Sequence, residues 1–153
     1  MILCLYGQPG SGKTTLARAF MEMYDLTQDK RFKDFYHIDG DMLREVTQNN
    51  DYTRQGRIEN CMLANRIAMY SQVLGYLPVM SIVHPFGNER AHLVRAGACL
   101  IYLINANTPT DKRRYRIPDF ESLPVMNVLY TGACPVDESA RAVMDIYNKH
   151  ANR

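Results

Sequence analysis

The chain has 153 residues, and its 46% hydrophobic and 22% charged residues are typical of a folded globular domain rather than a disordered segment. Its 18 lysines and arginines nearly balance its 16 aspartates and glutamates, which argues against a nucleic-acid binder that works through bulk positive charge. Because no apolar run approaches the roughly 18 residues of a membrane span, we expect one domain over residues 1–153 and no membrane partner.

Short apolar runs alternate with longer amphipathic stretches along the chain. The apolar runs predict five strands, at residues 2–6, 35–38, 77–83, 100–104 and 126–130. The other stretches predict helices at residues 14–24, 55–74 and 88–95, and a last helix with Asp137 as its N-cap. Apolar strands separated by helices imply an α/β fold, in which helices cover both faces of a five-stranded parallel sheet. Such sheets bind ligands at the carboxyl ends of their strands.

The apolar residues of three helices fall at helical spacing. The aligned residues are Leu16, Phe20 and Met23 in the first helix, Ile58, Met62, Met69 and Val73 in the long one, and Ala140, Val143, Met144 and Tyr147 in the last.

The four cysteines, by contrast, are scattered: Cys4, Cys61, Cys99 and Cys134. A disulfide or zinc framework would cluster them, so we expect a reduced, cytoplasmic protein. Residues 1–6 have no basic region or cleavage site, and we expect no signal peptide.

Residues 7–14 match Gly-x-x-x-x-Gly-Lys-[Ser/Thr] at every fixed position, after an apolar strand and at the start of a helix. Glycines let backbone N–H groups approach phosphate oxygens, and the helix N-terminus adds partial positive charge. Lys13 would reach the β- and γ-phosphates of ATP, and Thr14 would hold Mg²⁺. A chance glycine-rich turn is the alternative. The predicted ATP-binding residues are Gly7, Gln8, Pro9, Gly10, Ser11, Gly12, Lys13, Thr14 and Thr15.

This loop alone does not separate kinases from GTPases, ATPases and motors. A GTPase would carry Asn-Lys-x-Asp after a late strand, and residues 105–108 (Asn-Ala-Asn-Thr) do not match it. A motor or AAA-type ATPase would need a longer chain and a clear acidic strand end. The length therefore favours a small-molecule kinase.

Three further segments resemble the adenylylsulfate (APS) kinase family. Residues 39–44 (Asp-Gly-Asp-Met-Leu-Arg) resemble its DGDxxR motif, residues 52–60 its aromatic-Ser-x-x-x-Arg-x-Glu-Asn segment, and residues 81–90 its third-strand segment S-x-I-S-P-Y-R-x-x-R. Residues 104–106 (Ile-Asn-Ala) resemble the end of its fourth strand. The resemblance implies a three-layer P-loop kinase fold, ATP and Mg²⁺ as cofactors, and a small-molecule nucleotide as substrate.

Lys13, Asp39 and Asp41 are the predicted catalytic residues. Asp41 follows a strand across from the phosphate-binding loop, where it could orient or deprotonate the hydroxyl that attacks the γ-phosphate. Its alternative role is the N-cap of a helix through Arg44. By analogy with the family, Asp39 would hold Mg²⁺ or its waters and contact the substrate.

The resemblance also implies a substrate-binding set. Arg57 and Asn60 lie three residues apart, and therefore on one helix face; the matching pair in the family contacts the nucleotide substrate, and Arg44 contributes similarly. Tyr52 matches an aromatic residue that stacks on the substrate adenine, and Tyr115 would cover its other face. A solvated polar face and exposed loop residues are the alternatives.

Residues 112–116 (Lys-Arg-Arg-Tyr-Arg) place four cations after the fourth strand. Nucleotide kinases have a lid there whose arginines stabilise the transferring phosphoryl group. We expect Arg113, Arg114 and Arg116 to serve in a short lid over residues 107–120. A solvated loop and a nucleic-acid patch are the alternatives.

Two residues depart from the family pattern. His84 stands in place of a serine, and Gly87 in place of an arginine. The histidine is assigned to the substrate site, where it could donate a hydrogen bond or carry charge near pH 7; a structural role is the alternative. Together with the short lid, these changes leave the acceptor open.

The resemblance implies ATP-dependent phosphorylation of the ribose 3′-hydroxyl of adenylyl sulfate, which gives 3′-phosphoadenylyl sulfate and ADP. One alternative keeps the reaction and changes the acceptor, for example to cytidine diphosphoramidate, because kinases acting on that compound resemble this family. A second is a non-catalytic ATP-binding switch. Members of the family often dimerise, so a homodimer is also left open.

Overall fold

A computed structural model of the chain describes residues 1–27, 31–122 and 127–153. Within them, parallel strands form one sheet in the order β2-β3-β1-β4-β5. The strands are β1 (Leu3–Tyr6), β2 (Phe35–Asp39), β3 (Leu77–Ile82), β4 (Cys99–Asn105) and β5 (Val128–Thr131). The α/β class with a five-stranded parallel sheet, predicted from the apolar runs, is therefore confirmed. Met126, the first residue of the predicted last strand, lies outside the described residues.

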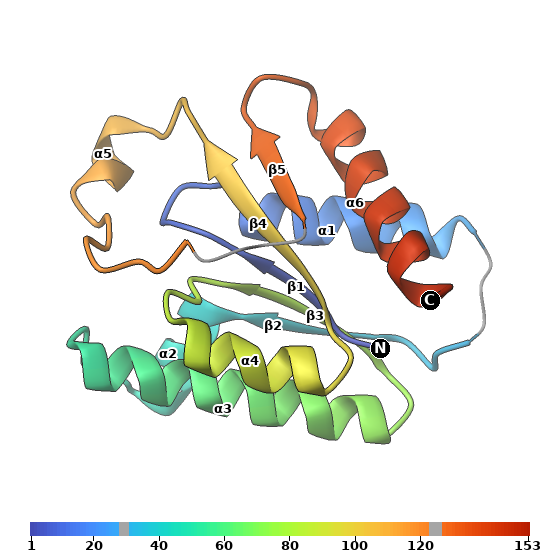
Figure 1. Cartoon of the computed structure of the whole chain (residues 1–153), viewed down its shortest axis with the longest axis horizontal. Coiled ribbons are helices and arrows are strands. Elements are labelled where there is room, and N and C mark those ends of the chain that lie inside the picture. The colour runs from blue at the N-terminus through green and yellow to red at the C-terminus, as the bar shows by residue number, and fades with distance from the viewer. Residues whose placement is uncertain (28–30, 123–126) are drawn as a thin grey trace.

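Helices cover both faces of this sheet and give three layers (Figure 1). They are α1 (Lys13–Asp25), α2 (Gly40–Thr47), α3 (Arg54–Val73), α4 (Gly87–Arg95), α5 (Thr110–Arg113) and α6 (Val136–Ala151). Helices α1 and α6 pack together on one face, and α3 and α4 lie on the other. The carboxyl ends of the strands point to one edge, where α2 begins and where α5 follows β4 (Figure 1).

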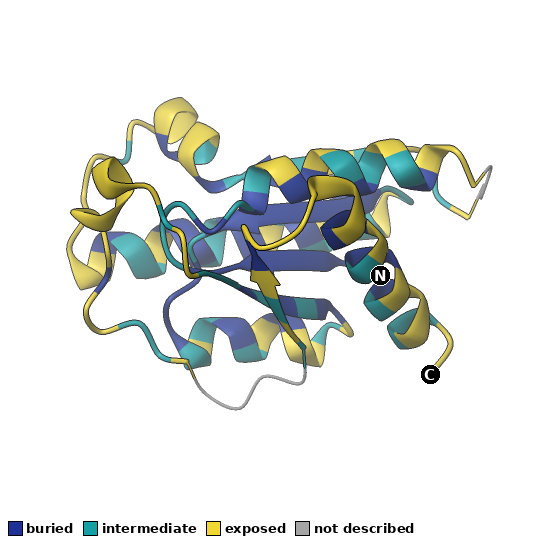
Figure 2. Cartoon of the chain, turned by 90° about the horizontal axis from the view of Figure 1, so that it is seen from above, coloured by how far each residue is buried: buried dark blue, intermediate teal, exposed yellow. Residues whose placement is uncertain are grey.

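Each face of the sheet has its own hydrophobic core. On the α1 and α6 side, Leu3 and Leu5 of β1 pack with Phe20 and Tyr147. On the other side, Cys4 of β1 packs among residues of α3 and α4. The central strands are buried on both faces (Figure 2), which is why their sequences are apolar throughout. The inward faces predicted for the first and last helices are confirmed, although Met23 is only half-buried.

The buried face of α3 differs from the apolar face that its spacing indicated. Val73 is 84% exposed, and Ile58, Met62 and Met69 are only half-buried. Small and polar residues are buried instead: Gly56, Asn60, Cys61, Ala64, Asn65, Ala68 and Ser71. Small side chains let a long helix lie close to the sheet, and this tertiary packing overrides the hydrophobic pattern of the helix.

Two helix starts also differ from the capping residues considered. Asp39, rather than Asp41, is the N-cap of α2, and its side chain accepts hydrogen bonds from the N–H groups of Asp41 and Met42. Pro135, rather than Asp137, precedes α6, and Asp137 lies in the first turn. An acidic residue is favourable at either place because both lie at the positive end of the helix dipole, so composition alone does not choose between them.

Candidate active site

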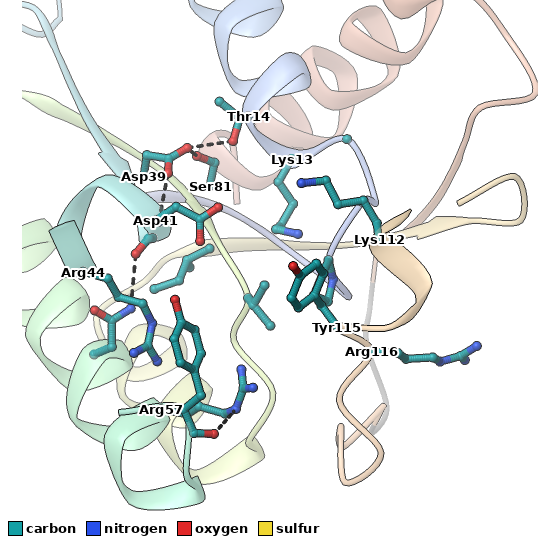
Figure 3. Close-up of a pocket in the computed structure, with 18 of the residues that line it drawn as sticks. Lys13, Thr14, Asp39, Asp41, Arg44, Arg57, Ser81, Lys112, Tyr115 and Arg116 are labelled. Carbon is teal, nitrogen blue, oxygen red and sulfur yellow. Dashed lines mark hydrogen bonds between the residues drawn. The ribbon is translucent and has the colours of Figure 1, made fainter. Parts of the chain in front are cut away.

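At the carboxyl edge of the sheet, five segments surround a cavity of about 830 Å³ (Figure 3). They are the phosphate-binding loop with the start of α1, the end of β2 with α2, the segment from Tyr52 into α3, the end of β3, and residues 112–116. The structure brings most of the predicted site together here: Pro9, Gly10, Gly12, Lys13, Thr14, Thr15, Asp39, Asp41, Arg44, Tyr52, Arg57, Asn60, Arg114, Tyr115 and Arg116. Gly7, Gln8, Ser11, His84 and Arg113 are not part of its lining.

The phosphate-binding loop turns at two glycines with left-handed backbone. Gly10 has φ 80° and Gly12 has φ 85°, a region that residues with a Cβ rarely adopt. Gly12 is also the N-cap of α1, whose first turn has neither a capping side chain nor an acidic residue in the described structure. The N–H groups at this helix end are therefore available to an anion, as a phosphate site requires.

Lys13 is held inside this loop and is 8% exposed. Its Nζ donates to the carbonyl oxygen of Gln8 at 2.8 Å and to Ser11 Oγ at 3.3 Å. Burial lowers the pKa of Lys13 to about 8, against the raising effect of Asp41 and Asp39. Figure 3 shows the side chains of Lys13 and Asp41 pointing into the same space. A phosphate there would stabilise the charged form of the amine and raise its pKa again.

The carboxylate of Asp39 accepts four hydrogen bonds. Thr14 Oγ1 donates to its Oδ2 at 2.7 Å and Ser81 Oγ at 3.0 Å, while the N–H groups of Asp41 and Met42 donate to Oδ1 at 3.0 and 3.3 Å. Burial alone would raise the pKa of Asp39, but these hydrogen bonds outweigh it and lower the pKa. Asp39 is therefore ionised at neutral pH, and it ties α1, α2 and β3 together at one point.

These contacts change how the predicted Mg²⁺ site is built. A carboxylate has about four lone-pair positions, and all four positions on Asp39 are used within the protein. Thr14 gives its hydrogen to Asp39, which leaves the oxygen lone pairs of its hydroxyl for a cation. The exposed carboxylate of Asp41 lies nearby. This hard-oxygen donor set fits Mg²⁺ brought in with a phosphate ligand, with Asp39 supporting Thr14 rather than coordinating the ion itself.

Arg44 and Arg57 both contact Tyr52. Arg44 Nη1 donates to the carbonyl oxygens of Asn49 and Asp51, at 3.1 and 2.8 Å, and its guanidinium lies 4.5 Å from the Tyr52 ring centre. Arg57 Nε donates to the Tyr52 carbonyl oxygen at 2.9 Å, and its guanidinium lies 5.5 Å from the ring. The two arginines thus hold an exposed aromatic ring at the cavity wall, with attraction between the cations and the ring contributing.

Asn60 and His84 are both buried, but in different surroundings. The side chain of Asn60 lines the cavity, and its Oδ1 has no hydrogen-bond partner within the described residues. His84 is fully buried outside the cavity, and its Nε2 bonds Asn65 Oδ1 at 2.9 Å. Burial and the nearby Arg90 lower the pKa of His84 to about 3, so it is neutral at pH 7. This environment favours the structural role over contact with a substrate.

Sequence reasoning did not single out three residues of this region. Ser81 lies opposite Asp39 in the register of β2 and β3, a pairing that depends on sheet order. His37 Nε2 bonds Ser81 Oγ at 2.9 Å and so extends the Asp39 network back along β2. Lys112 lines the cavity together with the predicted lid residues. Its position in the cluster of four cations at residues 112–116 is the sequence feature that could have assigned it to the site.

The three-layer fold and this site define a P-loop kinase. The chain belongs to the adenylylsulphate kinase family, whose sequence model matches residues 1–120. The sequence motifs predicted this family.

One curated relative is a cytidine diphosphoramidate kinase from Campylobacter jejuni, which is 33% identical over 85 residues. This match covers 56% of the chain and only 48% of the relative's length.

Solved structures show the same fold. The Mycobacterium tuberculosis APS kinase in complex with AMPPNP and APS matches with a TM-score of 0.80 and 17% identity, over 96% of each chain. A hexameric APS kinase from Thiobacillus denitrificans matches with a TM-score of 0.71 and 18% identity, over 97% of this chain and 29% of that one. Within the described residues, no helix is both long and apolar enough to cross a membrane.

Proposed function

We propose that this protein transfers the γ-phosphoryl group of ATP to a ribose hydroxyl of an anionic, nucleotide-linked acceptor, with adenylyl sulfate as the first acceptor to consider. One observation carries the proposal. The phosphate-binding loop, Asp41 and the residues Tyr52, Arg57 and Asn60 all line the same cavity. A protein that only binds ATP has no need of this second set of groups.

The donor half of the cavity suits a triphosphate. The free N–H groups at the start of α1 and the ammonium group of Lys13 surround the same point, and phosphoryl transfer depends mainly on such positioning and electrostatic stabilisation. The hydroxyl of Thr14 would hold Mg²⁺ brought in with ATP, and the ion would supply positive charge against the charge that develops on the phosphates. Lys112, Arg114 and Arg116 add positive charge from the opposite wall.

Asp41 is the proposed general base. Its carboxylate is exposed and points into the cavity near Lys13, whereas the oxygens of Asp39 are all engaged (Figure 3). In the proposed step the acceptor hydroxyl oxygen attacks the γ-phosphorus, its proton moves to Asp41, and ADP leaves. Asp39 has the supporting role of holding Thr14 and the first turn of α2 in place.

The acceptor half suits a flat, charged molecule with hydrogen-bond donors. Tyr52 offers an exposed ring for stacking, and Tyr115 stands on the opposite wall (Figure 3). Asn60 lines the cavity, and its buried Oδ1 has no partner among the described residues, so an N–H or O–H group of the substrate that reached it would satisfy it. Arg57 keeps its terminal nitrogens for an anionic group.

Cytidine diphosphoramidate is the second candidate acceptor. The 33% identity to the Campylobacter jejuni kinase acting on that compound favours it. The departure at Gly87 from the APS kinase pattern favours it too. Both acceptors combine a nucleoside with an anionic group, so both would use an aromatic wall and positive charge in the cavity.

ADP release with a panel of adenylyl sulfate, cytidine diphosphoramidate and a simple sugar acid tests the proposal. We expect turnover with a nucleotide-linked acceptor and none above background with the sugar acid. Asp41→Asn should reduce kcat by about 100-fold or more while ADP affinity stays within about twofold. Asp145→Asn, which changes an exposed aspartate on α6, is the matched control. ATP binding without turnover on any nucleotide acceptor would support a binding switch instead.

A further inference from the structure

The side chain of Gln8 bonds Ile117, just beyond the cationic residues 112–116, and Gln8 is not part of the cavity lining. Its Nε2 donates to the carbonyl oxygen of Ile117 at 2.9 Å, and the N–H group of Ile117 donates to its Oε1 at 2.9 Å. This reciprocal pair joins positions 109 residues apart in the sequence. Two parallel hydrogen bonds fix orientation as well as distance, as one rung of a sheet does.

Ile117 is the anchor of the segment expected to act as a lid, residues 107–120, which we call the candidate lid. From residue 109 to residue 119, every residue except Ile117 is exposed, and Ile117 is 3% exposed. Helix α5 buries none of its residues. Between residues 109 and 119, burial therefore holds the segment at Ile117, and Gln8 pairs with the backbone at that same position. The adjoining end of the candidate lid is held as well, because Phe120 stacks on Tyr6 and Tyr102 and Arg54 pairs with Asp119.

A second contact joins the first half of the candidate lid to the same loop. A Cβ added at Gly10 would lie 3.0 Å from both Lys112 Cβ and Thr108 Cγ2, so two side chains of the lid lie close to this glycine. Asn105 Nδ2 also donates to the Gly10 carbonyl oxygen at 3.1 Å. The cationic residues 112–116 are thus flanked by two attachments, one near Gly10 and one at Ile117.

We infer that Gln8 is a positioning residue that ties the candidate lid to the phosphate-binding loop, so that the lid cations stand opposite Lys13 over the transferring phosphoryl group. Figure 3 shows Lys112 and Tyr115 on the wall that faces Asp41 and Arg44. The catalytic consequence rests on the proposed kinase function, whereas the mechanical link between loop and lid does not. This assigns the Gln8 side chain to the lid rather than to direct contact with ATP.

Hydrogen exchange at the Ile117 amide tests the link without any acceptor or turnover. Gln8→Met keeps the length of the side chain and removes both hydrogen-bonding groups, so exchange at Ile117 should become about 10-fold faster or more. The amides of Leu5 and Ile101 in the sheet core should be unchanged, and they report that the fold is intact. Unchanged exchange at Ile117 would overturn the inference.

Kinetics test the consequence for catalysis. With the acceptor found by the panel, Gln8→Met should lower kcat by about 5-fold or more, while ADP affinity changes by less than about twofold because the backbone phosphate site remains. Gln72→Met, on the distant end of α3, is the matched control for the substitution itself. Full kcat despite faster exchange at Ile117 would refute the positioning role.

Gln8→Glu supplies a second variant in case Gln8→Met also exposes the sheet amides. Glutamate keeps an acceptor for the Ile117 N–H, loses the donor to its carbonyl oxygen and adds a negative charge. We expect the Ile117 amide to stay protected in this variant, and its loss of protection would contradict the hydrogen-bonded pairing. If no acceptor is turned over, exchange at Ile117 still decides whether the link exists.

Discussion

Replacing Asp39 with asparagine removes one charge while it keeps the shape of a side chain at the end of β2. In the native protein, two hydroxyl groups and two backbone N–H groups donate to this carboxylate. In Asp39→Asn the amide oxygen still accepts from the two N–H groups. The new NH₂ group faces Thr14 and Ser81, whose hydroxyls must turn and accept from it. The geometry survives, but the four hydrogen bonds lose the charge.

The size of the effect follows from that change. Hydrogen bonds to a charged group contribute about 1.5–3 kcal/mol each and neutral ones about 0.5–1.5 kcal/mol, so four bonds lose about 4 kcal/mol in total. Relief from burying the charge offsets part of this loss, and we expect the free energy of unfolding to fall by about 2 kcal/mol. Thr14 then has one free lone pair instead of two, so Mg²⁺ should strengthen ADP binding less than in the native protein.

Urea unfolding followed by circular dichroism at pH 7 measures the free energy of unfolding of Asp39→Asn and of the native protein. The exposed Asp145→Asn is the control. The pKa of Asp39 is lowered in the folded state, so the ionised side chain stabilises the folded protein. This stabilisation is fully present above the ordinary aspartate pKa of 3.8 and is lost as the pH falls through the lower pKa of the folded state. The difference in free energy of unfolding between the native protein and Asp39→Asn should therefore shrink below pH 3.8. A loss under about 0.5 kcal/mol at pH 7, or a gap independent of pH, would refute the reasoning.

Two further predictions concern titration. The pKa of Lys13 is lowered to about 8, so the free protein loses the positive charge of this side chain as the pH rises. The value of kcat/KM for ATP should therefore decline above about pH 8. A flat profile to about pH 10 would contradict this role of Lys13. The pKa of His84 is lowered to about 3, so the unfolded chain binds more protons between that value and 6.5, and stability should fall as the pH drops through this window. His84→Gln, which keeps a donor for Asn65, should reduce that acid sensitivity in urea titrations at pH 4 and pH 7; an equal slope in both proteins would contradict the burial argument.

The phosphate-binding loop and the sheet could be predicted from local sequence. The turn at residues 7–14 needs left-handed backbone at Gly10 and Gly12, and only glycine adopts it readily, so the motif can be read without a fold. The central strands are apolar on both faces because helices cover both faces of a parallel sheet. Asp39 ends β2 and Asp41 follows it closely, and the carboxyl ends of parallel strands share an edge. These features depend on neighbours in the chain, so their residues were predicted.

Tertiary structure decided what depends on distant partners. The hydrophobic pattern of α3 misplaced its buried face, because close packing on the sheet selects small side chains rather than the most apolar ones. His84 follows β3 like a site residue, yet Asn65 and Arg90 enclose it away from the cavity. Gln8 belongs to the phosphate-binding motif, but its side chain pairs with Ile117. Sequence position specifies the backbone of a motif, whereas the direction and partners of its side chains are set by residues that only folding brings near.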